Sequence, residues 1–360
     1  MPEIWLNYGS TNVVLDIRAE NLDQQLETKG PFLNDSEIAE KLEQIDISKP
    51  IELVALNNSE SVKKTIKTIY DKCEQKSLQK PRILADKKIL NLIKEGLPEG
   101  SPVAEFGNND LKNSSLVFIG EMEFDGLFGF ETIATRLVKK FGNDDMLSAY
   151  EKRKENLPIP GQESENIKIA QKFTDSFEIV SIEIAANSQG VVDLAVGHPS
   201  STMSISKPFL SHAQKNVEKH RTMMISTGKD ASNDTLGRSL SSLWNCNKAI
   251  KDNGLAILLA ECTNGIASEA IQQFIEGRMS LDRLKKPSKY VNGMEDLLFL
   301  TEIQKRFQVG IVSILPEFYL KKLNIISFGG IKQAMDHILK SQGIKQKIAV
   351  VSDGARLLLN

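Results

Sequence analysis

A run of six apolar residues at 255–260 constrains the fold of this chain more than any other feature. It has no polar alternation, which is typical of a strand buried on both faces of a parallel sheet. Asp252-Asn253-Gly254 precedes it and predicts a helix end, because Gly and Asn tolerate the left-handed conformation at a helix C-terminus. Glu261-Cys262-Thr263-Asn264-Gly265 follows, and Ser268 predicts the next helix start. This succession favours a doubly wound α/β domain.

Strand and helix patterns alternate along the rest of the chain as well. In the first half, apolar runs at 50–56, 82–85 and 116–120 are each followed by a helical segment, as in parallel strand–helix–strand units. Beyond residue 214 the alternation becomes regular. The chain of 360 residues is therefore predicted to form two α/β domains, residues 1–213 and residues 214–360. The second is expected to contain a doubly wound, Rossmann-like parallel sheet.

Composition argues against several classes of function. A net charge of -2 and the lack of a basic cluster argue against nucleic-acid binding. No apolar run approaches the roughly 20 residues that cross a bilayer, and the N-terminus lacks a signal-peptide pattern. We therefore expect a cytoplasmic protein without a membrane partner. The three cysteines are far apart and form no C-x-x-C motif, which argues against a disulfide framework or a structural zinc site.

Polar residues directly after buried strands are the first candidates for a site, because open parallel sheets bind ligands at the carboxyl ends of their strands. Glu261 follows the run at 255–260, and it either acts as an acid or base or caps the next helix. Glu121 and Glu123 follow an earlier strand and leave the same two interpretations open. Cys262 has no histidine near it in sequence, so a buried, inert thiol is expected.

The four histidines do not indicate a metal site. His212 and His220 are predicted to share one helix, where eight residues separate them by about two turns. Metal-binding pairs on a helix are usually four residues apart, as in HExxH. Gly329-Gly330-Ile331-Lys332 precedes a helix whose N-terminus could bind an anion, but a simple glycine loop explains this run as well.

Several segments resemble the nickel-pincer lactate racemase family. They are "VEKHRTMMISTGKD", "NCNKAIKDNGLAILLAECTNGIASEAIQQFIEG", the closing "VGIVSILPEF…KIAVVSDGARLLL", and the hairpin-like "WLNYGSTNVVLDI" and "FEIVSIEIAANSQGVVDLAVG". The resemblance implies two α/β domains with a cleft between them. It also implies racemisation or epimerisation of a 2-hydroxy acid. In that family a nickel pincer tethered to a lysine takes the hydride, and histidines accept the hydroxyl proton.

The motifs that carry this chemistry in the family differ in this chain. After the first core strand the family has an aspartate and then threonine-arginine, where this chain has Asn57-Asn58-Ser59-Glu60. After the second it has glycine-x-histidine-arginine-proline, where this chain has Leu84-Ala85-Asp86-Lys87-Lys88. The family's cofactor lysine lies in a loop before a Glu-Thr-Ile helix start. Glu131-Thr132-Ile133 is kept here, but Gly126-Leu127-Phe128-Gly129 adjoins it and the lysine loop is deleted.

The resemblance also points to other positions. The family's asparagine-histidine pair falls near Arg136 and Leu137, and the glutamine and lysine of the second domain's first helix fall at about Arg238 and Ser241. A chemistry that needs a lysine anchor, a nickel-ligating histidine and proton-accepting histidines cannot persist unaltered after these changes.

We therefore predict a divergent lactate racemase-like protein without the pincer cofactor and without a bound metal. It is expected to bind a small hydroxy acid or another carboxylate, or a protein. The alternatives are an active enzyme with a rebuilt interdomain site and a regulatory or scaffolding protein. The candidate catalytic residues are Glu261 and Arg238, and the candidate ligand-binding residues are Glu131, Thr132, Arg136 and Ser241.

Overall fold

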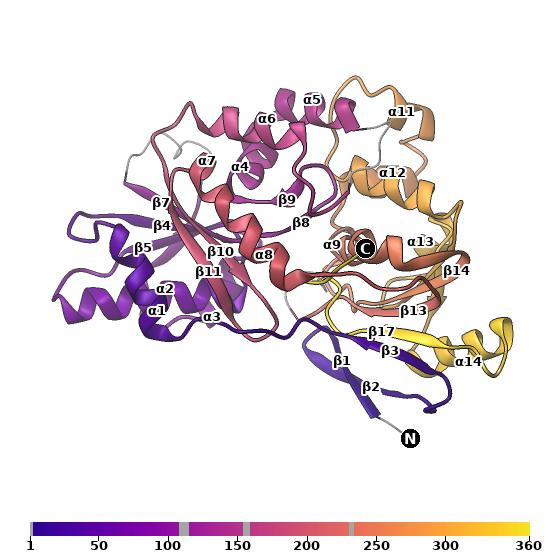
Figure 1. The fold of residues 1–360 in the computed structure, drawn as a ribbon. Coiled ribbons are helices and arrows are strands. Elements are labelled where there is room, and N and C mark those ends of the chain that lie inside the picture. The colour runs from indigo at the N-terminus through magenta and orange to yellow at the C-terminus, as the bar shows by residue number, and fades with distance from the viewer. Residues whose placement is uncertain (1–2, 108–114, 154–158, 230–233) are drawn as a thin grey trace.

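The computed structural model describes residues 3–107, 115–153, 159–229 and 234–360. The chain forms two α/β domains, each built on a six-stranded sheet (Figure 1). The predicted fold class is confirmed. Within the described residues, none of the helices combines the length and the apolar character that crossing a membrane requires.

The first sheet has the strand order β11-β10-β7-β4-β5-β6. Its neighbours pair in parallel except β10 and β11, which form a predicted hairpin. One face packs on helices α1, α2 and α3, and the other on α4. The bounds are β4 (Glu52–Ala55), β5 (Arg82–Ala85), β6 (Val103–Glu105), β7 (Leu116–Glu121), β10 (Val180–Ala186), β11 (Val191–Gly197), α1 (Asp35–Lys41), α2 (Glu60–Gln75), α3 (Leu90–Glu95) and α4 (Ile133–Phe141).

The second sheet has the strand order β16-β15-β14-β13-β17-β3, and all its neighbours pair in parallel. One face packs on α9, α10 and α12, and the other on α14 and the β1–β2 hairpin. The bounds are β1 (Glu3–Tyr8), β2 (Thr11–Asp16), β3 (Leu22–Leu26), β13 (His220–Ser226), β14 (Ile250–Leu259), β15 (Gln308–Val312), β16 (Ile326–Phe328), β17 (Ile348–Val351), α9 (Leu236–Cys246), α10 (Glu269–Ile275), α12 (Met294–Ile303) and α14 (Ile331–Gln342).

The remaining elements connect the two domains or cover them. They are β8 (Glu123–Asp125), β9 (Gly129–Glu131), β12 (Gln214–Lys215), β18 (Leu358–Leu359), α5 (Asn143–Arg153), α6 (Glu165–Thr174), α7 (Pro199–Thr202), α8 (Ser206–Ala213), α11 (Leu281–Lys285) and α13 (Glu317–Lys322).

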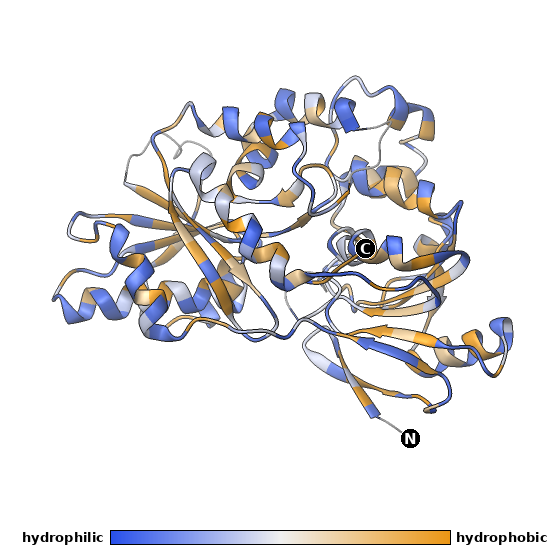
Figure 2. Ribbon diagram, in the orientation of Figure 1, coloured by the Kyte–Doolittle hydropathy of each residue, from blue (hydrophilic) through white to orange (hydrophobic). Residues whose placement is uncertain are grey.

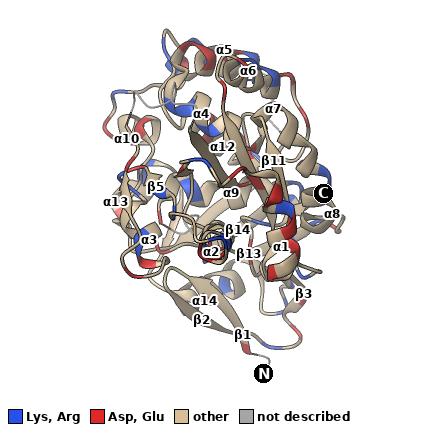
Figure 3. Ribbon diagram, turned by 90° about the vertical axis from the view of Figure 1, so that its left-hand side faces the viewer, with Lys and Arg blue, Asp and Glu red and all other residues tan. Residues whose placement is uncertain are grey.

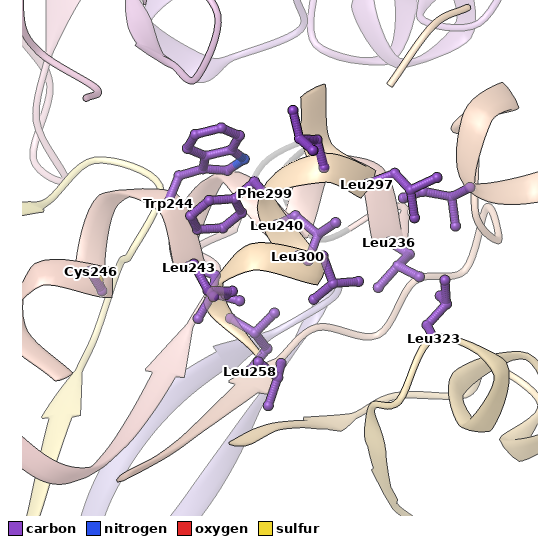
Figure 4. Close-up of a cluster of buried hydrophobic side chains, with 14 of the residues drawn as sticks. Leu236, Leu240, Leu243, Trp244, Cys246, Leu258, Leu297, Phe299, Leu300 and Leu323 are labelled. Carbon is purple, nitrogen blue, oxygen red and sulfur yellow. The ribbon is translucent and has the colours of Figure 1, made fainter. Parts of the chain in front are cut away.

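Apolar patterning explains why the strands occupy the centre of each domain. Figure 2 shows hydrophobic residues along the central strands and hydrophilic residues on the outer sides of the helices. Residues 255–259 of β14 are all buried, as the unbroken apolar run predicts. In Figure 4 the leucines of α9 point toward those of α12, and Trp244 lies flat against Phe299. Their ring centroids are 3.8 Å apart. Packing of this kind fixes α9 and α12 at the face of the second sheet.

The division of the chain between the two sheets differs from the predicted one. Residues 1–213 were assigned to the first domain, but β3 pairs in parallel with β17 and so extends the second sheet. The β1–β2 hairpin also packs on this sheet, through Leu6 and Leu15. Residues 3–26 therefore belong structurally with residues 214–360. The strand β3 was not predicted, because its sequence LDQQL is mostly exposed at a sheet edge and has no apolar pattern.

The run Asp252-Asn253-Gly254 does not end a helix. The preceding helix α9 ends at Cys246, and the run lies inside β14 at a bulge, between the pairs His220↔Ile250 and Thr222↔Leu255. A Cβ at Gly254 would lie 2.6 Å from the carbonyl oxygen of Arg221, so close approach of two strands requires the glycine. Asn253 does adopt the left-handed conformation, with a φ of 57°, but in a strand and not at a helix end.

Two further expectations were wrong. The charged sequence of residues 143–162, which contains Pro158 and Pro160, predicts a connector. Its first part instead forms helix α5, and residues 154–158 lie outside the described residues. His212 and His220 do not share a helix, because His212 lies in α8 and His220 begins β13.

Candidate functional site

The carboxyl ends of the two sheets are joined by an ion pair. Glu121 ends β7 of the first sheet, and Arg356 lies beyond the end of β17 in the second. The Nε and Nη2 atoms of Arg356 donate to Oε1 of Glu121 at 3.0 and 2.8 Å. Arg356 also contacts Asp353 at 3.3 Å. Glu121 is only 2% exposed, so the two domains meet through a buried charge pair.

The short β8–β9 hairpin adds two more carboxylates at this position. Its antiparallel register places Glu123 directly opposite Glu131. Like charges in such a pair repel each other, and a cation between them offsets the repulsion. Arg136 of α4 supplies it, because its Nη2 lies 3.2 Å from Oε2 of Glu123 and 3.3 Å from Oε2 of Glu131. Burial opposes the charge on Arg136, but Glu131 and Glu123 raise the pKa of its guanidinium above the usual value.

A second cation of α4 lies one turn further along. The Nζ of Lys139 is 2.5 Å from Oδ2 of Asp125 and 3.0 Å from Oε1 of Glu131. Burial disfavours the ammonium charge, but Asp125 and Glu131 more than compensate and raise the pKa of Lys139. Arg136 and, to a smaller extent, Lys139 hold the pKa of Glu131 well below its usual range despite burial. Basic residues along α4 are visible in Figure 3.

The second domain contributes Arg238 from the first turn of α9. Thr235 caps this helix and accepts a hydrogen bond from the Arg238 backbone N–H at 3.2 Å. The Nη2 of Arg238 lies 3.9 Å from Oε2 of Glu123 and 4.0 Å from Oε2 of Glu131. These distances exceed hydrogen-bond length, and the guanidinium has no closer partner in the described part of the chain. With its side chain 36% exposed, Arg238 can accept a ligand.

We call this group the interdomain charge cluster. It consists of Glu121, Glu123, Asp125, Glu131, Arg136, Lys139, Arg238, Asp353 and Arg356. The β8–β9 hairpin that carries three of its carboxylates is docked on the second domain. A Cβ at Gly126 would lie 2.7 Å from the Trp244 ring, so the turn of the hairpin packs directly on α9 (Figure 1).

A protonatable carboxyl lies beneath the cluster. Glu183 of β10 is 1% exposed, and its Oε2 accepts a hydrogen bond from the backbone N–H of Ile133 at 2.9 Å, at the start of α4. Its Oε1 is buried without a partner among the described residues. Burial raises the pKa of Glu183 to about 8, although the Ile133 N–H and Arg136 act in the opposite direction.

Two acids of α12 also lie near the hairpin. Trp244 donates its Nε1–H to Asp296 at 3.1 Å, and Tyr290 donates its hydroxyl to Glu295 at 3.0 Å. Burial raises the pKa of both carboxyls, and for Asp296 the neighbouring Glu295 raises it further. Asp296 thus holds the indole ring of Trp244, against which Gly126 of the hairpin packs.

Some of the predicted site residues lie in the interdomain charge cluster, and others make only local contacts within a helix. The first group is Glu131, Arg136 and Arg238, together with Glu121 and Glu123. Thr132 caps α4, where its Oγ1 accepts the Thr135 N–H at 3.3 Å, and Ser241 donates its hydroxyl to the Arg238 carbonyl at 2.8 Å.

Glu261 lies at the carboxyl end of β14, where the sequence placed it, but beneath the β1–β2 turn. A Cβ at Gly9 would lie 1.6 Å from its Oε2, and Glu261 forms no ion pair within the described residues. Burial, and secondly Glu261, raise the pKa of Tyr8. Cys262 is buried, and burial raises the pKa of its thiol to about 12, in line with the expected inert thiol.

Sequence reasoning missed several members of the cluster. Asp125, Lys139, Asp353 and Arg356 come from separate segments with ordinary composition. Asp353 and Arg356 could have been suspected, because they follow the apolar strand that ends at Val351 and so lie at a carboxyl end.

The histidines lie elsewhere and are engaged in other contacts. His198 contacts the Thr174 carbonyl oxygen, His212 that of Pro208, and His220 the carboxylate of Asp23. His337 packs against the ring of Phe328. Among the described residues, no group of three His, Cys, Asp or Glu side chains is arranged to hold a metal ion.

The chain is thus a two-domain α/β protein, and its two sheets meet at their carboxyl ends. The sequence matches no family model and no curated protein. The structure is similar to the lactate racemase apoprotein from Thermoanaerobacterium thermosaccharolyticum, with a TM-score of 0.72, 15% identity and full coverage of both chains. It is also similar to the crystal structure of a protein from Thermotoga maritima, with a TM-score of 0.67 and 11% identity, over 93% of this chain and 99% of that one. The chain has the lactate racemase fold, as the sequence resemblance implied.

Proposed function

We propose that this protein binds a small carboxylate between its two sheets, in a site that differs from that of a nickel-pincer enzyme. The observation that supports this most directly is Arg238. It lies at the carboxyl edges of both sheets, where ligands of α/β folds bind, and its guanidinium is the least satisfied cation of the cluster. Arginine binds carboxylates through parallel N–H groups.

The residues of the cluster do not fit the nickel pincer. The sequence resemblance puts the family's lysine loop just before Glu131-Thr132-Ile133, where this chain has the β8–β9 hairpin with Glu123, Asp125 and Glu131. Lys139 is the lysine of the cluster, but its ammonium is paired with two carboxylates and its pKa is raised. A lysine must lose its proton to form a covalent bond through its nitrogen. The histidine contacts described above also lie outside the cluster.

Two measurements test this proposal. Calorimetric titration with lactate, alanine, malate and aspartate should detect binding, and Arg238→Met should weaken it by about tenfold or more. Arg221→Met, which changes an exposed arginine of β13, is the matched control and should leave binding unchanged. Absence of binding by all four compounds would refute the carboxylate site.

The second measurement concerns the cofactor. The protein is co-expressed with pincer-synthesis enzymes and then analysed by intact mass and nickel content. The expected result is the unmodified mass and no stoichiometric nickel. One nickel per chain together with a mass adduct on a lysine would overturn this part of the proposal.

One observation favours a second function, an active enzyme with a rebuilt interdomain site. The pKa of Glu183 is about 8, and acid–base groups of enzymes commonly titrate near neutral pH. Incubation of each ligand in D2O, followed by NMR of the hydrogen at C2, tests this function. Deuterium incorporation would support catalysis. Its absence after long incubation would refute the enzyme function and leave ligand binding as the only proposed function.

A further inference from the structure

We propose that the ligand is a zwitterion of the α-amino acid class, whose carboxylate binds Arg238 and whose ammonium group binds Glu123. This inference rests on the proposed carboxylate site and specifies the chemistry of its ligand. It depends on three properties of the cluster: the exposure of these two side chains, their unused hydrogen-bonding capacity and the balance of charge around them.

Glu123 and Arg238 are the members of the cluster that solvent reaches most. Their side chains are 34% and 36% exposed, whereas Arg136 between the two hairpin glutamates is only 8% exposed. They come from different domains, and their nearest atoms are 3.9 Å apart. A ligand at this position therefore meets one carboxylate and one guanidinium side by side.

Both side chains have hydrogen-bonding capacity to spare. A guanidinium has five N–H donors, and in Arg238 none of them lies within hydrogen-bond distance of a described acceptor. In Glu123, Oε1 accepts from Asn57 at 3.3 Å and Oε2 contacts Arg136 at 3.2 Å. A carboxylate offers about four lone-pair sites, so Glu123 retains acceptor positions. The carboxylate and ammonium groups of an α-amino acid are attached to one carbon, so they can meet adjacent partners of opposite charge.

The charge balance of this pair disfavours a ligand that is only an anion. Glu123 and Arg238 contribute one negative and one positive charge. An added monoanion would leave one negative charge without a counterpart in a partly buried place, where unpaired charge is costly. A zwitterion brings a positive group with its negative group and leaves the net charge unchanged.

Pairs of ligands that differ only at C2 test this inference by calorimetric titration. Alanine and lactate share a carbon skeleton, with an ammonium group in one and a hydroxyl group in the other; aspartate and malate form a longer pair. We expect each amino acid to bind about tenfold tighter than its hydroxy acid. Glu123→Gln should remove this preference, and Arg238→Met should weaken both members of a pair. Glu178→Gln, an exposed surface change, is the control and should preserve the preference.

N-Acetylalanine extends the test to the unaltered protein, which matters if Glu123→Gln does not fold. It lacks the ammonium charge and should bind no tighter than lactate. Equal or tighter binding of the hydroxy acids would overturn the zwitterion while leaving the carboxylate site intact. A preference for amino acids that persists in folded Glu123→Gln would overturn the role of Glu123. If none of the compounds binds, the proposed function itself fails, and this inference fails with it.

Discussion

Replacement of Glu183 by glutamine should change how the stability of this protein depends on pH. Glu183 is 1% exposed, and its Oε2 accepts the Ile133 N–H. A glutamine amide can accept the same hydrogen bond through its oxygen, and it carries no charge at any pH. The substitution therefore preserves the shape and the contact while removing the titration.

The magnitude follows from the pKa of about 8 in the folded chain, compared with an ordinary value of 4.5. An acid whose pKa is raised by folding binds its proton more tightly in the folded state. Below pH 4.5 the carboxyl is protonated in both the folded and the unfolded state, so its raised pKa does not lower the free energy of unfolding. Between pH 4.5 and 8 the free energy of unfolding falls as pH rises. At 1.36 kcal/mol per unit, the loss is about 3 kcal/mol at pH 7 and about 5 kcal/mol above pH 8.

Urea unfolding followed by circular dichroism at several pH values from 4.5 to 8.5 measures this effect. Wild type and Glu183→Gln should have similar stability at pH 4.5, and the variant should be more stable by about 3 kcal/mol at pH 7. Glu295 and Asp296 also have raised pKa values, but they contribute equally to both proteins. The exposed Glu178→Gln variant should follow wild type. Parallel pH profiles for wild type and Glu183→Gln would refute the reasoning.

Three other predictions concern the contact between the domains and the thiols. Arg356→Met should lower the free energy of unfolding in urea by about 3 kcal/mol, because it breaks a buried pair, and adding Glu121→Gln should restore part of the loss. Gly126→Ala places a Cβ 2.7 Å from the Trp244 ring, so it should cost about 1–3 kcal/mol by thermal unfolding; an unchanged midpoint would mean that the turn can move. A thiol reagent at pH 8 should label no cysteine of the native protein and all three in urea, since all three are buried and the pKa of Cys262 is about 12. Fast labelling of Cys262 in native protein would contradict the buried thiol.

Elements with a strong local pattern were predictable from the sequence. The apolar run at 82–85 predicts the strand β5 with its observed bounds, and the pattern of residues 317–322 likewise predicts the helix α13. Helix α2 begins after Ser59, whose side chain accepts the Val62 N–H as expected of a cap. In each case a short segment contains all the information, because an apolar run or a capping residue acts on its own neighbours.

Features that depend on distant segments were not predictable in this way. The polar strand β3 exists because β17 offers an open edge, more than three hundred residues further along the chain. The sequence around Gly254 predicts a helix end, but the role of this glycine comes from the Arg221 carbonyl on the adjacent strand. The interdomain charge cluster is the extreme case, because Glu121 and Arg356 are 235 positions apart.

The chemistry of the cluster itself argues for a role beyond stability. Removing ionised groups from water costs several kcal/mol each, and well-packed apolar residues commonly stabilise a domain interface as well or better. The face of α9 that packs on α12 shows that this chain can build such an interface, with Trp244 stacked on Phe299. At the carboxyl ends of its sheets it instead places Arg238 too far from Glu123 and Glu131 for a hydrogen bond. An arrangement optimised for stability alone would shorten those contacts. Loosely paired charges at a sheet edge are what a site needs if a ligand is to complete the pairing.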